Sequence, residues 1–291
     1  MFAGVYTALV TPFNDKKEID KECLKKIVKF QLDKGISGLV PVGTTGESPT
    51  VTHQENMDVI EMVVKEVNGR VPVIAGTGSN STDEAIRMTK IAKDIGANAS
   101  LQVSPYYNKP TQEGLYQHFM TIADAVDLPV MVYNIQGRTG VNINTDTLMR
   151  LAKHENIVAV KEASGDLGQM MEVLRRKPAD FDVLSGDDNL ALPLVLLGGA
   201  GVVSVVSNII PKRMEELVLA ARQGELDKAR KLHYDLLPLF KSMFVETNPI
   251  PVKTAMAAMG LIKDVYRLPL CQASEENRKF IQNVLKDYGL I

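Results

Sequence analysis

The sequence has few cysteines and histidines and no excess of positive charge, which are the usual signs of disulfide frameworks, metal centres and nucleic-acid interfaces. Its only cysteines, Cys23 and Cys271, are too few for a disulfide framework and have no metal-type spacing. The four histidines are scattered and form no His-x-x-x-His pair. The net charge is -2 and no basic block is present, so nothing indicates a nucleic-acid partner or an anionic membrane surface. We therefore expect a cytoplasmic protein that binds no metal.

We also expect neither a signal peptide nor a membrane-spanning segment. The N-terminus has no basic segment and is interrupted by Pro12, so we expect no signal peptide. Residues 189–211 contain no charged side chain and are long enough to span a bilayer. This stretch is broken by Pro193 and by glycines at 198, 199 and 201. We interpret it as a buried helix, a turn and a buried strand.

What the sequence does contain is a repeating alternation of short apolar runs, polar turns and segments of helical periodicity. Most runs are continuously apolar, which is typical of strands buried on both faces of a parallel sheet. The runs are at residues 4–10, 37–42, 71–76, 99–104, 128–134, 157–163, 181–186 and 201–207. Eight strand–helix units predict either a closed (β/α)8 barrel or an open doubly wound sheet.

The alternation stops after Gly224, and three helical segments follow, at residues 225–244, 251–260 and 275–289. No flexible linker precedes them. We expect a catalytic barrel over residues 1–224 and a C-terminal three-helix region over residues 225–291 that packs on it. Two earlier helices have capping-box starts, Thr52 with Glu55 and Ser81 with Glu84.

Polar residues follow nearly every predicted strand, at the positions that share one edge of a parallel sheet. The turn GTTGES, residues 43–48, offers hydroxyls and free amides that suit a small carboxylate or phosphate. It lacks the Gly-Lys-Ser/Thr ending of a nucleotide-binding loop. Arg138 carries the fork of donors that clamps a carboxylate. Tyr133 ends a strand, where its phenol either relays a proton or closes the core.

Lys161 ends the apolar run IVAVK at residues 157–161. Burying an ammonium group is unfavourable unless it is paired or loses its proton. Lys161 is therefore either a strand-end lysine that reaches solvent or an amine in a closed site. Desolvation lowers the pKa of such an amine from ~10.4 toward neutrality, so that it can attack a carbonyl and form a Schiff base. The neighbouring polar turns, Tyr133 and Arg138 favour the second interpretation.

Several long motifs occur in order: VTPF, GTTGES, AGTG, PYYN-x-P, YN-x-x-x-RTG, KEASGD, LSGDD and NPIPVK. With them the chain resembles the 4-hydroxy-tetrahydrodipicolinate synthase (dihydrodipicolinate synthase) family over essentially its whole length. This family belongs to the pyruvate-dependent class I aldolase and N-acetylneuraminate lyase superfamily. The resemblance implies a TIM barrel with a C-terminal helical extension. It also implies a lyase-type condensation of pyruvate with L-aspartate 4-semialdehyde, the first step toward diaminopimelate and lysine, with no cofactor beyond the covalent imine of pyruvate.

The resemblance further implies roles for individual residues. Four would carry the chemistry, namely the imine-forming Lys161 and a proton relay of Tyr133, Thr44 and, from a neighbouring subunit, Tyr107. Four would contact substrates: Thr45 for the pyruvate carboxylate, Arg138 for the semialdehyde carboxylate, and the backbone near Gly186 and Val203. Four would form a lysine-feedback site: His53, Asn80, Glu84 and Tyr106. The assembly implied is a homo-oligomer, a dimer of dimers.

The chain departs from the family pattern at a few positions. Gln136-Gly137 precedes Arg138 where the family usually has proline at 136, and Val203 replaces the more frequent isoleucine. Pro49 and Asn56 stand where strongly lysine-regulated members tend to have a small residue and a histidine. Two other functions stay open: a sugar-acid aldolase of the N-acetylneuraminate lyase or 2-keto-3-deoxygluconate aldolase type, and a non-catalytic relative that binds a small acid.

Overall fold

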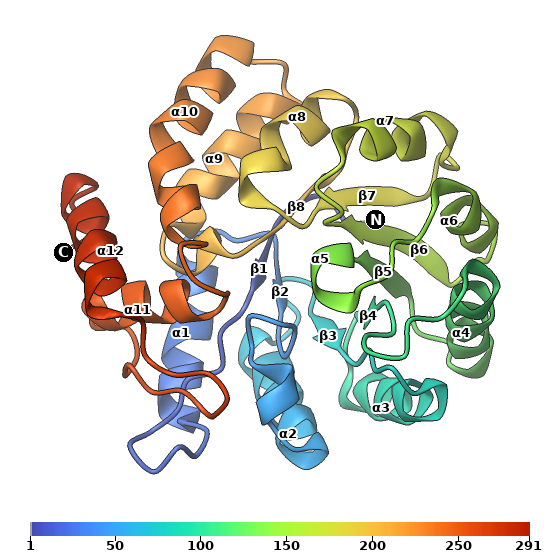
Figure 1. Ribbon diagram of the computed structural model, residues 1–291, viewed down its shortest axis with the longest axis horizontal. Helices are drawn as coiled ribbons and strands as arrows, with labels where there is room; N and C mark the ends of the chain where they lie inside the picture. The colour runs from blue at the N-terminus through green and yellow to red at the C-terminus, as the bar shows by residue number, and fades with distance from the viewer. Residues whose placement is uncertain (1) are drawn as a thin grey trace.

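A parallel β-barrel forms the centre of the computed structural model, which describes residues 2–291 (Figure 1). All eight predicted strands are present in this part of the chain: β1 Gly4–Ala8, β2 Gly38–Val40, β3 Ile74–Gly76, β4 Ala99–Val103, β5 Val130–Asn134, β6 Ile157–Glu162, β7 Asp182–Ser185 and β8 Gly201–Ser204. They pair in the order β2-β1-β8-β7-β6-β5-β4-β3. A parallel bridge between Leu39 and Val73 joins the two ends of this order. The closed arrangement excludes the open doubly wound sheet.

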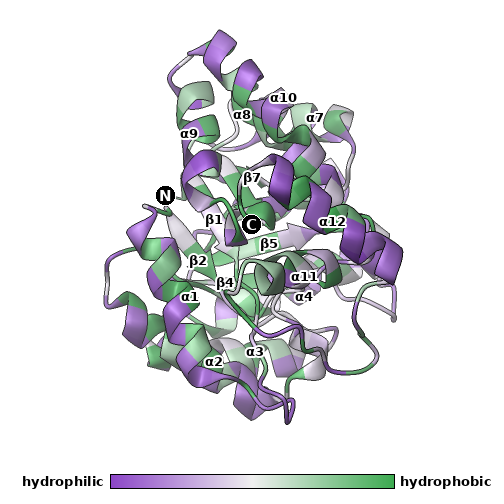
Figure 2. Cartoon of the chain, turned by 90° about the vertical axis from the view of Figure 1, so that its left-hand side faces the viewer, coloured by the Kyte–Doolittle hydropathy of each residue, from purple (hydrophilic) through white to green (hydrophobic). Residues whose placement is uncertain are grey.

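Helices surround the barrel because most strands are followed by an amphipathic segment (Figure 2). They are α1 Lys21–Asp33, α2 His53–Val67, α3 Thr82–Ile95, α4 Gln112–Ala125, α5 Gln136–Thr139, α6 Thr145–Leu151, α7 Leu167–Arg176, α8 Ala191–Leu196 and α9 Pro211–Arg222, with the short 3-10 helices η1 Ser48–Thr50, η2 Asp188–Leu190 and η3 Val206–Asn208. Every residue of β1, β2, β5 and β8 is buried. This confirms the expectation of strands covered on both faces.

One of the two predicted capping boxes is confirmed. The Thr52 side chain accepts from the backbone N–H of Glu55, and the Glu55 carboxylate accepts from the backbone N–H of Thr52. The prediction at Ser81 is wrong, because its side chain makes no capping hydrogen bond. Glu84 instead accepts from the Ser79 hydroxyl and lies 2.9 Å from Nε2 of His53.

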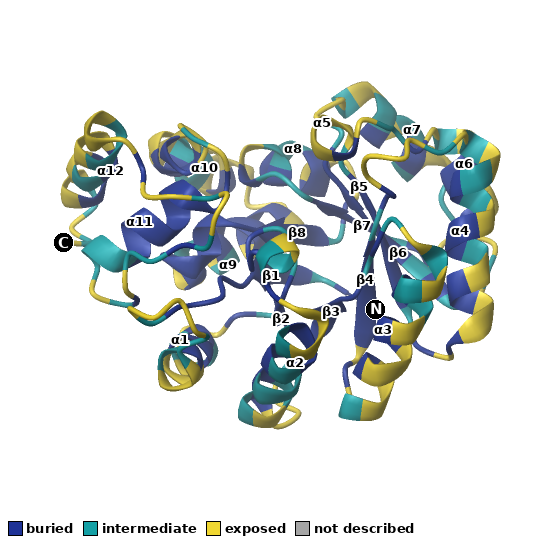
Figure 3. Cartoon of the chain, turned by 60° about the horizontal axis from the view of Figure 1, so that its bottom comes forward, coloured by how far each residue is buried: buried dark blue, intermediate teal, exposed yellow. Residues whose placement is uncertain are grey.

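The three predicted C-terminal helices are α10 Leu226–Ser242, α11 Ile250–Ala258 and α12 Glu275–Asp287. Helix α10 packs on α9, and α11 lies between α12 and η3 at the end of the barrel. Figure 3 shows α11 as almost entirely buried, whereas α12 has an exposed outer side. Lys253 of α11 forms an ion pair with Glu47, and both side chains are 0% exposed. Residues of α11 therefore reach the turn that follows β2.

The uncharged stretch at residues 189–211 folds as the sequence indicates, into helix α8, strand β8 and the short η3. Across residues 2–291, the helices are all too short or too polar to cross a lipid bilayer.

Candidate active site

Lys161 lies at the end of β6 and is only 5% exposed. Its backbone is in register with Tyr133 on β5 and Leu184 on β7, so the side chains of three neighbouring strands meet at this level. The Nζ atom of Lys161 is 4.1 Å from the centre of the Tyr133 ring. Within residues 2–291, this Nζ has no ion pair and no hydrogen bond. The amine is therefore buried without a counter-charge in contact.

Burial lowers the pKa of Lys161 to about 8, although the negative charges of Asp187 and Asp188 oppose the change and Arg138 adds to it. With such a pKa, roughly one molecule in ten carries a neutral amine at pH 7. The neutral amine is the form that attacks a carbonyl carbon. Lys161 thus has the electrostatic setting of a nucleophile.

Tyr133 supplies a protonated phenol beside this amine. Burial raises the pKa of Tyr133 above its ordinary value, and both the charge of Arg138 and a hydrogen bond with the Thr44 side chain oppose the rise. Tyr133 and Thr44 line the same cavity of about 40 Å³, between β5 and the turn after β2. A phenol that keeps its proton at neutral pH can donate it to a reacting oxygen.

The absence of a side chain at Gly186 leaves room for the Lys161 side chain. A Cβ atom at this position would lie 3.1 Å from Cε of Lys161 and 2.5 Å from Cβ of Ala163. A side chain there would therefore push the lysine out of place. Val203 is buried inside the barrel in the same apolar cluster as Tyr133.

Thr45 and Arg138 are linked by a residue that the sequence reasoning missed. Nδ2 of Asn248 donates to Oγ1 of Thr45 at 3.0 Å. The backbone oxygen of Asn248 accepts from Nη2 of Arg138 at 3.1 Å. Arg138 lies in α5, a short exposed helix that begins at Gln136. The available signal was the NPIPVK motif, which contains Asn248 but suggests no contact with either residue.

Tyr107 does not join this group within a single chain. It is 90% exposed and has a φ of 72°, a backbone conformation that is uncommon for a residue with a side chain. Its neighbour Tyr106 is also exposed. An exposed aromatic side chain on a constrained loop is typical of an anchor in a protein–protein contact.

The residues predicted for feedback inhibition lie beside a separate cavity. His53, Glu84 and Tyr106 line a space of about 100 Å³, together with Pro49 and Asn56. Asn80 is next to it, and its Nδ2 donates to the backbone oxygen of Tyr106 at 3.1 Å. This cavity adjoins the one lined by Tyr133 and Thr44, since both share four lining residues: Ser48, Gly76, Gly78 and Val103.

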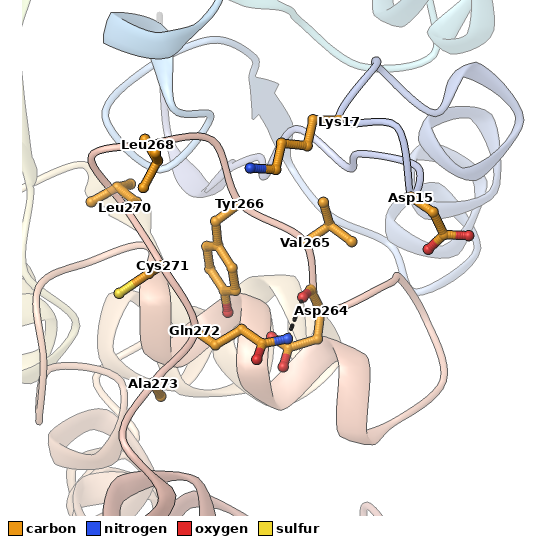
Figure 4. Close-up of a pocket in the computed structure, with 10 residues that line it drawn as sticks. All are labelled: Asp15, Lys17, Asp264, Val265, Tyr266, Leu268, Leu270, Cys271, Gln272 and Ala273. Atoms are coloured by element: carbon orange, nitrogen blue, oxygen red, sulfur yellow. Dashed lines mark hydrogen bonds between the residues drawn. The ribbon is translucent and has the colours of Figure 1, made fainter.

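A recess of about 600 Å³ lies elsewhere, between residues 15–17 and 264–273 (Figure 4). None of the residues predicted for catalysis or binding lines it. The side chain of Gln272 spans part of it and donates to the backbone oxygen of Asp264 at 3.0 Å. Among the described residues, no group of three or more His, Cys, Asp or Glu side chains is placed to hold a metal ion.

Known proteins resemble this chain along its whole length. The model of the dihydrodipicolinate synthetase family matches residues 1–288. A 4-hydroxy-tetrahydrodipicolinate synthase of Methanocaldococcus jannaschii is 53% identical over 292 residues, which cover 100% of both chains. Two crystal structures are similar. That of dihydrodipicolinate synthase from Aquifex aeolicus has 49% identity and a TM-score of 0.98, with 99% of each chain covered. The enzyme of Acinetobacter baumannii, in complex with pyruvate, has 45% identity and a TM-score of 0.98 over 100% of both chains.

Proposed function

The chain belongs to the dihydrodipicolinate synthetase family, and we propose that Lys161 condenses pyruvate with L-aspartate 4-semialdehyde to give 4-hydroxy-tetrahydrodipicolinate. This reaction leads to diaminopimelate and lysine. The observation that carries the proposal is the Lys161 amine, which is buried, has a pKa of about 8 and lies 4.1 Å from the centre of the Tyr133 ring.

The covalent steps follow from amine and carbonyl chemistry. The neutral Lys161 amine adds to the keto carbon of pyruvate, and the carbonyl oxygen leaves as water to form an imine. Loss of a methyl proton converts the imine to an enamine, whose carbon attacks the aldehyde of the second substrate. The amino group of that substrate becomes part of the product ring, so it displaces the Lys161 nitrogen and restores the free amine.

We assign the proton transfers to Tyr133, Thr44 and Tyr107. The Tyr133 phenol donates to the oxygen that leaves the keto carbon and accepts the proton again in a later step, and Thr44 is its hydrogen-bond partner. Tyr107 completes this relay from a neighbouring subunit, for which its exposure on a constrained loop is the supporting observation. The relay therefore requires an oligomer, and we propose a dimer of dimers.

The carboxylate groups of the two substrates are assigned to different residues. Thr45 binds the pyruvate carboxylate, and Arg138 binds the carboxylate of the semialdehyde at the rim of the barrel. Gly186 and Val203 line the pocket between them. Residues 1–224 form the catalytic barrel in this proposal, and residues 225–291 support it. The enzyme functions in the cytoplasm.

We also propose that lysine inhibits the enzyme weakly by binding in the 100 Å³ cavity beside His53, Asn80, Glu84 and Tyr106. Pro49 and Asn56 line the same space, and their difference from strongly regulated members is the reason to expect weak binding. Titration with lysine at millimolar concentrations tests this, since an unchanged rate would rule out the site.

Hydride trapping tests the proposed function. The protein is reduced with borohydride in the presence of pyruvate and digested, and the modified peptide is identified by mass spectrometry. We expect one pyruvate-derived adduct, on Lys161. An unmodified protein, or an adduct on another lysine, would rule out the mechanism. Assays with the semialdehyde and with sugar-acid substrates then identify the second substrate, and efficient cleavage of sialic acid would favour a sugar-acid aldolase instead.

A further inference from the structure

We propose that Asn248 is a positioning residue that sets the geometry of Thr45 and Arg138 together, and thereby the affinity of the enzyme for both carboxylate substrates. The inference rests on the proposed function, since it concerns the two residues assigned to those carboxylates. It adds a residue from the C-terminal region to a site otherwise built from the barrel.

The contacts of Asn248 connect two distant parts of the site. The residue is 6% exposed and lies immediately before the start of α11. Its side chain donates to Oγ1 of Thr45 at 3.0 Å, and its backbone oxygen accepts from Arg138 at 3.1 Å. A displacement of Asn248 would therefore change the surroundings of both residues.

The hydrogen bond to Thr45 determines what the threonine hydroxyl can do. A hydroxyl has one proton to donate and two lone pairs that accept, and its proton rotates to suit its neighbours. When the Asn248 amide occupies a lone pair of Thr45, the hydroxyl proton is free to point at a substrate carboxylate. Without this amide, no contact within residues 2–291 would hold the buried hydroxyl in that orientation.

A second contact holds the same two segments together. Lys253, in the first turns of α11, forms a buried ion pair with Glu47, two residues beyond Thr45. The start of α11 and the turn after β2 are therefore fixed to each other at two points. The Asn248 amide is placed against a rigid support, as accurate positioning of a binding group requires.

The side-chain oxygen of Asn248 is buried and accepts no hydrogen bond within residues 2–291. The amide is therefore held in place through its Nδ2, by the contact with Thr45.

The experiment compares Asn248→Ala with Tyr266→Phe. Tyr266 is a matched control because its hydroxyl makes buried hydrogen bonds in the same region, to Ile250 and Thr254, and none to Thr45 or Arg138. The rate of borohydride trapping at Lys161 is measured against pyruvate concentration. We expect half-saturating pyruvate to rise about tenfold in Asn248→Ala, as for one lost hydrogen bond to a binding group, with the maximal rate unchanged. Tyr266→Phe keeps the wild-type values.

The KM values of the complete reaction separate positioning from a general loss of structure. In Asn248→Ala, the KM for pyruvate rises most, because the variant keeps the backbone oxygen that accepts from Arg138, and kcat stays within about twofold of wild type. A folded Asn248→Ala protein with wild-type half-saturation overturns the proposal, and so does an equal rise in Tyr266→Phe. A wild-type protein that forms no adduct instead overturns the proposed function, and this role with it.

A second variant keeps the proposal testable if Asn248→Ala does not fold. Asn248→Asp has nearly the same shape, but its ionised carboxylate cannot donate to Thr45 and repels pyruvate. We expect half-saturating pyruvate at neutral pH to rise at least as much in Asn248→Asp as in Asn248→Ala. A folded Asn248→Asp protein with wild-type half-saturation overturns the positioning role.

Discussion

Lys161 and Lys253 are both buried lysines, and each has its ammonium group over an aromatic ring, at 4.1 Å for Tyr133 and 4.4 Å for Phe13. Burial lowers the pKa of each. Their partners differ, because Lys253 is paired with Glu47 whereas Lys161 has no ion pair within residues 2–291. A carboxylate in contact holds a buried amine in its charged form, and its absence leaves the amine able to lose a proton. We infer that the partner, and not burial alone, separates a structural lysine from one that can act as a nucleophile.

The largest expected effect comes from Lys161→Met. The variant has no amine to form the imine, so we expect activity to fall by at least about a thousandfold. Thermal stability should stay the same or rise, because an apolar chain replaces an unpaired buried amine. Initial rates measure the loss of activity, and thermal unfolding measures the stability. If Lys161→Met lost its fold as well as its activity, Lys161 would be a structural residue like Lys253.

Lys253→Met should do the reverse and reduce stability. The substitution leaves the Glu47 carboxylate buried without its partner, which costs about 3–5 kcal/mol. The free energy of unfolding, measured with urea, should fall by that amount. The double variant Lys253→Met with Glu47→Gln is the control, since it removes the orphaned charge and should recover part of the loss. A single variant as stable as wild type would show that the ion pair contributes little.

Removing the hydroxyl of Tyr133, near Lys161, or of Tyr266, near Lys253, should have smaller effects, and the two variants can be compared directly. Tyr133→Phe keeps the ring over Lys161 and removes the proton donor, so we expect kcat to fall about a hundredfold while trapping at Lys161 still occurs, more slowly. The Nζ atom of Lys253 is 5.0 Å from the centre of the Tyr266 ring. Tyr266→Phe keeps this ring and should leave kcat unchanged. Equal losses in both variants would mean that the Tyr133 hydroxyl has no special part in the reaction.

The pH dependence should reflect the unpaired lysine. Because the pKa of Lys161 is about 8, the reactive neutral fraction of the amine falls about tenfold for each pH unit below that value. The kcat/KM for pyruvate should therefore rise about tenfold per pH unit up to about pH 8 and then level off. The Tyr266→Phe enzyme should show the same profile. A midpoint near 10 would indicate a solvated lysine and contradict the buried position.

The features of the fold that depend on local pattern could be predicted from the sequence. The eight buried strands and the three C-terminal helices have clear periodicity, and Lys161 stood out because it ended an apolar run. The choice between a closed barrel and an open sheet came from the family resemblance, because strand patterns alone do not reveal how the first and last strands meet.

Contacts between distant segments could not be predicted. Asn248 and Thr45 are separated by 203 positions, and Lys253 and Glu47 by 206. Nothing in their local sequence indicates a partner. The same limit explains the error at Glu84, whose spacing from Ser81 fits a capping box although Ser79 and His53 compete for its carboxylate.

The attachment of α11 to the turn at residues 43–48 restricts how this protein could be re-engineered. A truncation after Gly224 would keep every strand and Lys161, yet it would uncover the Glu47 charge and remove the amide that holds Thr45. We expect this truncated protein to be inactive. In chimeras with related proteins, this turn and α11 should be exchanged together. A turn from one protein combined with α11 from another would disturb substrate binding, although every residue that touches the reacting atoms would be unchanged.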